Sequence, residues 1–448
     1  MASRRCSSRS PRLLALAALD GRELLASRAW WLLLAILGPL TGQAFITAIR
    51  SYAEMSGSRG GPAALAQGLS PLDGIVVPTL GAYDLAVTFL FPFVAIRLVS
   101  AERESGASKL LAQTPAGLAS RLAAKAAVLL LGWLLAWIPA FLALLLWKLY
   151  GGHLCGPETA NVFLGHVLHA FLAAGVAVAA ASVCRGSASA AIVTLGFTVG
   201  TWALDFVAAG RGGLLARLAE FTPAAALRTF EHGELRLAVV AVLLLAGLAG
   251  FTFAGLWLDP YRSAPSRVIR SAVLLLLTVG AAIPAASWRS GWDLAEDRRS
   301  SFPQADEAAL RKIEKPVRVT VYLSPEDPKL IDLQINVLAK LRRVLPRFEV
   351  AYAAQSRTGL FEDPESHYGE VWYQVGTRKD MLRSTIEPVV LEKLYELAGV
   401  AKPPEASDPG YPGYPLAAEP RGAALIFYIA CPLLAALAYW RSSCRKSA

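Results

Sequence analysis

The sequence contains few of the residues that usually carry chemistry. It has five cysteines and five histidines among 448 residues, and the cysteines show no spacing typical of a disulfide framework or a zinc site. The phosphate-binding pattern GxxxxGK[ST] does not occur, nor do the HExxH and GxSxG patterns of hydrolases. We therefore expect no metal ion, no bound cofactor and no catalytic residues, and the chain is predicted not to be an enzyme.

Charged residues are also scarce, whereas apolar residues form long runs. Charged residues make up 17% of the chain and hydrophobic residues 55%. Several runs reach the roughly 20 residues that a helix needs to cross a bilayer. The pattern predicts an α-helical polytopic membrane protein with about eight transmembrane helices, the second of them interrupted by Pro92. The predicted spans are Trp30–Ile49, Tyr83–Val99, Ala123–Leu149, Val162–Cys184, Ala188–Ala209, Leu237–Leu258, Ile269–Ser287 and Ala423–Trp440.

The net charge of +10 reflects lysines and arginines that gather at particular positions between the spans. They lie in residues 4–28, 97–125, 262–270 and 441–446, and at Arg185. If both termini are cytoplasmic, all of these positions fall on the cytoplasmic side, as the positive-inside rule requires. We therefore predict a multi-pass protein of the bacterial inner (plasma) membrane. The basic excess is a topology signal, and no nucleic-acid partner is expected.

A charged segment follows the second predicted span, within Phe91–Ala116. The apolar run passes into Glu102, Arg103 and Glu104, and Gly106 then allows a turn. A short amphipathic piece carrying Leu110 and Leu111 ends before Pro115. The pattern predicts a charged helical hairpin at the cytoplasmic face, where a soluble partner could push on two membrane helices. The alternative is a solvated cap that keeps the helix from sliding inward.

This segment resembles the permeases of ABC-2 type ATP-binding-cassette exporters. In that family the second membrane helix also runs into an acidic and arginine-rich knot, followed by a glycine, a leucine pair and a proline. The resemblance implies that a separate cytoplasmic ABC ATPase subunit binds ATP and Mg²⁺, and that Glu102, Arg103, Glu104, Gly106, Leu110, Leu111 and Pro115 form its coupling site. It also implies a dimer with a second permease copy or a paralogue, and export as the direction of transport.

The N-terminal segment predicts a helix that lies in the cytoplasmic interface of the bilayer. Leu14 and Leu24 belong to its apolar face, while Asp20 and Glu23 lie off that face, with Arg22 beside them. In ABC-2 permeases the equivalent helix also touches the ATPase. The alternative is a simple membrane anchor.

The segment between the seventh and eighth spans has the composition of a soluble domain. Alternating apolar residues predict strands at 316–323, 348–352 and 371–375, and helical spacing predicts helices at 330–341 and 386–397, the second closed by Gly399. The β-α-β-β-α order indicates a small extracytoplasmic α/β domain. We expect a cytoplasmic N-terminus at 1–29, a six-span permease domain at 30–258, a cytoplasmic linker at 259–267, a seventh span at 268–288, the α/β domain at 289–400, a Pro/Gly-rich tether at 401–422, an eighth span at 423–440 and a cytoplasmic tail at 441–448.

The start of this domain carries a second resemblance. Asp293–Arg298 reads DLAEDR directly after a membrane helix, and a proline, a short helix and the strand VRVTVYL follow. This order resembles the auxiliary protein of gliding-motility (Gld-type) ABC transporters. The chain therefore looks like a permease fused to a shortened auxiliary domain, although Phe302 stands where a Leu-Ser pair is expected. The resemblance implies an envelope protein as a further partner, besides the lipid bilayer itself.

Two other features allow more than one interpretation. The connection Gly210–Arg236 is either a re-entrant pair in the outer leaflet or a surface amphipathic helix. His166, His169 and Asp205 are polar residues within predicted spans, so they form either a candidate intramembrane polar site or ordinary packing contacts. Glycines 247, 250 and 255 are expected to permit close helix packing.

Two functions remain open from these patterns. The first is the permease subunit of an exporter, which would couple ATP hydrolysis on a separate subunit to movement of a substrate. The second is a non-transporting membrane scaffold that displays the extracytoplasmic domain to envelope partners.

Overall fold

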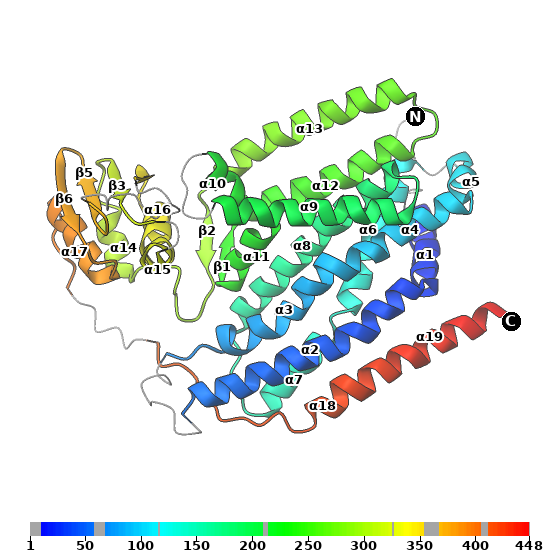
Figure 1. The fold of residues 1–448 in the computed structure, drawn as a ribbon, viewed down its shortest axis with the longest axis horizontal. Helices are drawn as coiled ribbons and strands as arrows, with labels where there is room; N and C mark the ends of the chain where they lie inside the picture. The colour runs from blue at the N-terminus through cyan, green and yellow to red at the C-terminus, as the bar shows by residue number, and fades with distance from the viewer. Residues whose placement is uncertain are drawn as a thin grey trace, which may run out of the picture. The chain divides into compact units, whose positions relative to one another are not determined.

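The protein is described here from a computed structural model, which covers residues 10–57, 68–114, 117–208, 214–324, 327–353, 367–404 and 411–447. The chain is mostly helical and divides into two compact units (Figure 1). The helical unit comprises Met1–Val199, Leu237–Ser290 and Pro412–Ala448. The α/β unit comprises Gly200–Arg236 and Gly291–Tyr411.

Eight helical segments in the described residues are long and apolar enough to cross a membrane. The prediction of a multi-pass helical membrane protein is therefore confirmed, and each predicted span overlaps one of these segments. They are Arg28–Met55, Leu72–Glu104, Leu118–Leu149, Gly156–Val183, Ser187–Ala208, Leu237–Leu258, Ala264–Ala286 and Ala423–Ser442.

The second span is longer than expected, and Pro92 does not interrupt it. Two π-helical turns, η2 (Leu72–Val76) and η3 (Ala86–Leu90), alternate with the helices α3 (Val77–Leu85) and α4 (Phe91–Glu104). Each π turn directly precedes a helix that has a proline in its first two positions. Local π adjustment re-satisfies backbone groups that a proline would leave unpaired, so the helix continues.

The third span is broken in its middle, between α6 (Leu118–Leu135) and α7 (Ile138–Leu149). The hydroxyl of Tyr83, from α3, inserts into the backbone ladder at this break. It donates to the Ala136 carbonyl and accepts from the Ala140 amide, both at 3.0 Å. A side chain inserted between these two groups satisfies both, which explains how a break is tolerated at a buried position.

Glycines allow α8 (Gly156–Val183) and α12 (Leu237–Leu258) to cross closely. A Cβ atom built at Gly175 would lie 2.6 Å from the Gly247 carbonyl oxygen, and one at Gly250 would lie 2.6 Å from the Gly175 backbone. A Cβ at Gly255 would lie 2.7 Å from the Leu122 side chain on α6. The packing role predicted for Gly247, Gly250 and Gly255 is thus confirmed.

The remaining helices of the helical unit surround this core. The N-terminal helices are α1 (Ser10–Ala26) and α2 (Arg28–Met55), and α5 (Ala107–Gln113) follows α4. The last span consists of α18 (Ala423–Leu425), the π turn η5 (Ile426–Ala430) and α19 (Cys431–Ser447), and α19 packs beside α2 (Figure 1). Two spans expose most of their apolar side chains, as spans facing lipid do: α9 (Ser187–Ala208) and α13 (Ala264–Ala286). The helix α13 packs on α12. Because α13 begins at Ala264, the turn before it is shorter than the predicted linker.

The α/β unit contains a four-stranded sheet in the order β4-β3-β5-β6. The strands β3 (Val317–Val321) and β4 (Phe348–Tyr352) are parallel, while β5 (Val371–Val375) runs antiparallel to β3 and to β6 (Arg378–Leu382). Its helices are α14 (Gln304–Leu310), α15 (Pro328–Leu333), η4 (Gln334–Leu338), α16 (Ala339–Val344) and α17 (Glu387–Ala398). The predicted strands and helices are all present, and Gly399 ends α17 with a φ of 72°. The strand β6 was not predicted, because RKDML lacks an alternating apolar pattern.

The connection before the sixth span also belongs to the α/β unit. It contains α10 (Leu214–Ala219) and α11 (Pro223–Glu231), and the Thr222 hydroxyl caps α11 by accepting from the Ala225 amide at 3.3 Å. The strands β1 (Glu234–Arg236) and β2 (Gly291–Asp293) then form an antiparallel ribbon. The ribbon was not predicted, because strands of three residues are too short to show alternation. Whether the helix pair is re-entrant stays a prediction.

Candidate functional site

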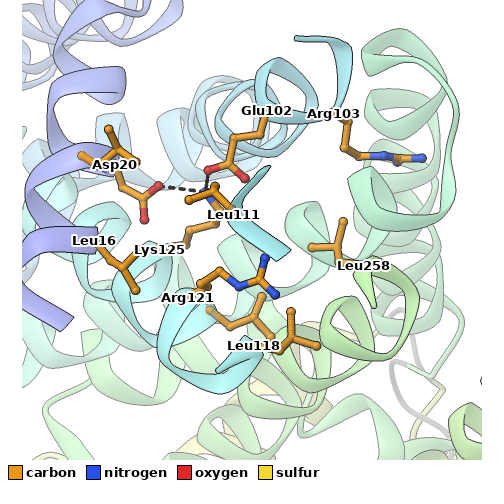
Figure 2. A pocket seen from close by; sticks show the side chains of 11 residues that line it. Leu16, Asp20, Glu102, Arg103, Leu111, Leu118, Arg121, Lys125 and Leu258 are labelled. Atoms are coloured by element: carbon orange, nitrogen blue, oxygen red, sulfur yellow. Dashed lines mark hydrogen bonds and ion pairs between the residues drawn. The ribbon is translucent and has the colours of Figure 1, made fainter. Parts of the chain in front are cut away.

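A cluster of buried charges joins three helices of the helical unit. The Lys125 ammonium on α6 donates to Asp20 Oδ1 on α1 at 2.8 Å and also binds Glu102 on α4 (Figure 2). The side chains of Lys125, Asp20 and Glu102 are only 5%, 6% and 12% exposed. One cation held between two carboxylates satisfies the requirement that buried charges be paired. The cluster ties the leading helix to the second and third spans.

Local sequence places each member of the cluster. Lys125 lies in an alanine-rich stretch of α6, where small neighbours leave room for the approaching carboxylates. Glu102 lies in the last turn of α4. On α1, Asp20 and Leu24 are four residues apart, so their side chains share one face of that helix. Both Asp20 and Leu24 are buried, at 4% and 5% exposure.

The two sides of α1 differ from the sequence pattern at one position, Asp20. Asp20 was expected off the apolar face, yet its side chain is buried against other helices, while Leu14 of the apolar face is 67% exposed. Arg22 is exposed and Glu23 is half-buried, as their place off the apolar face predicts. The reason for the difference is the ion pair with Lys125, which turns the aspartate inward. In the sequence Lys125 contributes to the topology signal, and as an ionisable residue within an apolar helix it also indicates a buried partner.

Arg103 points away from the cluster and binds the end of α8. Its guanidinium donates to the carbonyl oxygens of Ala181 at 2.5 Å, Cys184 at 2.8 Å and Ser182 at 3.3 Å. The last carbonyls of a helix have no partner within the helix, so this arginine satisfies them and complements the helix dipole. The end of the second span is thereby attached to the fourth.

The other residues of the predicted coupling segment differ in exposure. Glu104 pairs with Arg97 at 3.4 Å on the surface, and Gly106 forms the turn into α5 with a φ of 75°. Leu110 on α5 is 68% exposed, whereas Leu111 lines a pocket beside the charge cluster. Pro115 lies outside the described residues.

The three polar residues predicted within the membrane do not share one environment. His166 and His169 are buried on α8, and His169 Nδ1 lies 3.5 Å from Asp84 Oδ1 on α3. The ring of His166 packs edge-on against Trp137, with centroids 5.7 Å apart. Asp205 belongs to the α/β unit, where its carboxylate accepts from Arg228 at 2.5 Å. The acid beside His169 is thus Asp84, which the sequence pattern did not indicate.

The carboxylates around Lys125 also have a spacing that suits a cation. Oxygen atoms of Asp20, Glu23 and Glu102 lie within 4.8 Å of one another. The Lys125 ammonium already supplies positive charge to two of them. The carboxylates and Lys125 therefore form an ion-pair network.

Glu23 should make the stability of the protein depend on pH. Burial raises the pKa of its carboxyl above the ordinary 4.5, and the neighbouring Glu102 raises it further. Charged Glu23 therefore lowers stability above its raised pKa, and this penalty disappears as the pH falls to its ordinary value. We expect Glu23→Gln to raise the melting temperature at neutral pH, with the gain shrinking toward zero in mild acid.

Thermal unfolding of the purified protein across this pH range measures the effect. The matched control is Glu104→Gln, because Glu104 is a surface carboxylate outside the cluster. A Glu23→Gln variant that melts lower than the wild type at neutral pH would contradict the assignment.

Comparison of the chain with protein-family models, with curated proteins and with solved structures finds no match.

Proposed function

We propose that this chain is the membrane-spanning permease subunit of an ABC-2 type exporter in the bacterial inner membrane, driven by a separate ATPase subunit. The observation that carries the proposal is the Lys125 cluster, which joins α1, α4 and α6 at the point from which α5 projects. A permease that does not itself hydrolyse ATP needs such a connection between helices, because a displacement at its surface has to reach several spans together.

The contacts suggest how a push would be transmitted. The exposed side chains of Leu110 on α5 and Glu104 before it are the surface available to a soluble ATPase. A displacement of α5 passes through the Gly106 turn into α4. From α4 it reaches α6 through Glu102 and Lys125, and α8 through Arg103.

The other parts of the chain receive roles consistent with this proposal. Both termini lie in the cytoplasm, and ATP and Mg²⁺ bind to the ATPase subunit. A second permease copy or a paralogue completes the transport path. The sheet of the α/β unit lies outside the membrane and binds an envelope component or the exported substrate.

Binding of the ATPase tests the proposal. The full chain is co-expressed with ATP-binding-cassette ATPases of its own organism and purified through a tag on the chain. We expect Leu110→Asp combined with Glu104→Arg to reduce the co-purified ATPase by about tenfold or more, because truncating a central contact of an interface costs at least 1–2 kcal/mol. Both side chains are exposed, so the fold should be unaffected.

Ile331→Asp is the matched control, since Ile331 is an exposed apolar residue of the α/β unit. Glu102→Lys is unsuitable, because it would break the buried pair with Lys125. An ATPase that binds the double variant as well as the wild type, or no bound ATPase at all, would favour the membrane scaffold instead.

A further inference from the structure

A small pocket opens beside the charge cluster, between α1, α5 and α6. Its cavity volume is about 30 Å³, which is room for a group of the size of one or two water molecules. Five charged side chains line it, and the other lining residues are leucines. A whole nucleotide or drug-sized molecule cannot enter this space. One small polar group can, with the remainder of its molecule lying outside.

The charges that line the pocket do not balance. Lys125, Arg103 and Arg121 are cationic, whereas only Asp20 and Glu102 are anionic. Lys125 is held by the two carboxylates and Arg103 by the carbonyls of α8. The Arg121 guanidinium forms no hydrogen bond or ion pair with any residue that the structure describes, although its Nε is buried. The excess positive charge is therefore located on Arg121.

Arg121 is also well placed to bind an anion. Figure 2 shows its side chain extending beside Leu118 into the space below Leu111. It lies in the first turn of α6, where the helix dipole favours negative charge. A guanidinium presents paired N–H donors that match the oxygens of a phosphate.

The surroundings indicate that the phosphate belongs to a lipid. Leu19 both lines the pocket and is 49% exposed, and Leu14 on the same helix is 67% exposed. An amphipathic helix with exposed leucines lies in the interface of the bilayer, at the depth of the headgroups. We propose that Arg121 binds the phosphate of an anionic phospholipid, whose glycerol and acyl chains lie against the leucines at the mouth of the pocket.

The proposal is independent of transport and of the ATPase, so it can be tested on the chain alone. The full chain is purified in detergent, supplied with equal amounts of phosphatidylglycerol and phosphatidylcholine, and examined by native mass spectrometry. The wild type should retain phosphatidylglycerol preferentially. We expect Arg121→Gln to reduce this preference about fivefold, the usual contribution of one basic residue near an anionic membrane surface.

Two further variants make the result specific. Arg185→Gln removes an exposed arginine that does not line the pocket and should leave the preference unchanged. Arg121→Lys keeps the charge without the paired donors and should lose less than Arg121→Gln. Unchanged melting temperatures would show that the variants are folded.

Three results would overturn the proposal. The first is an equal loss in Arg121→Gln and Arg185→Gln, or no loss in either. The second is displacement of the lipid by inorganic phosphate at the same concentration, which would indicate a site for free phosphate. The third is an Arg121→Gln variant that retains its lipid but no longer co-purifies an ATPase, which would make Arg121 a docking residue for that protein.

Discussion

Lys125→Met is expected to destabilise the protein by about 3–5 kcal/mol, because it leaves two buried carboxylates without their cation. Lys125 is 5% exposed in its side chain and is the common partner of Asp20 and Glu102. Methionine has nearly the same length and lacks only the charge, so packing should change little. Unfolding of the purified protein in increasing denaturant, followed by tryptophan fluorescence, measures the loss.

A charge-free version of the cluster provides the control for this result. The triple variant Asp20→Asn, Glu102→Gln, Lys125→Met removes all three charges together, and replacing a buried ion network by neutral groups is often neutral for stability. We expect it to recover most of what Lys125→Met loses. A single variant that is as stable as the wild type, or a triple variant that is the least stable of the set, would show that the cluster is not a paired unit.

Arg103→Met is expected to cost about 2–3 kcal/mol, because hydrogen bonds to charged groups contribute about 1.5–3 kcal/mol and buried carbonyls without partners are penalised. The arginine satisfies the carbonyls of Ala181, Ser182 and Cys184 at the end of α8. Its loss should free the end of the second span from the fourth. The same denaturant titration measures the effect.

Two variants make the Arg103 result interpretable. Arg103→Lys keeps the positive charge near the helix end but offers a single donor group, so we expect it to recover only part of the loss. Arg97→Met removes an arginine whose pair with Glu104 is solvent-exposed, and exposed pairs contribute about 0–1 kcal/mol. If Arg103→Met costs no more than Arg97→Met, water has replaced the arginine and the attachment of α4 to α8 is unimportant.

The charge cluster also changes how the family-like segment after the second span is understood. Glu102 and Arg103 were expected to reach out to a partner, yet both are engaged within the helical unit. Glu104 and Leu110 are the members that face outward. Mutations at Glu102 and Arg103 would therefore reduce any partner-dependent activity by weakening the contacts of α4 with α6 and α8, even if neither residue touches the partner.

The eight spans, the main strands of the α/β unit and the glycine contacts between α8 and α12 were predictable from the sequence. Each depends on a local pattern: the bilayer sets the length of an apolar run, a half-buried strand alternates, and a close helix crossing needs glycine. The buried side of α1, the Lys125 cluster and the Arg103 contact were decided by tertiary structure. Lys125 and Asp20 are 105 residues apart, and no local periodicity specifies which of many charged residues will pair.

The same reason explains the elements that were missed. The strand β6 and the ribbon of β1 and β2 carry no pattern of their own and exist because a neighbouring strand offers hydrogen bonds. Asp84 became the partner of His169 only when α3 and α8 packed together. Hydrophobic periodicity thus determined which segments are buried, whereas long-range packing determined which polar groups meet.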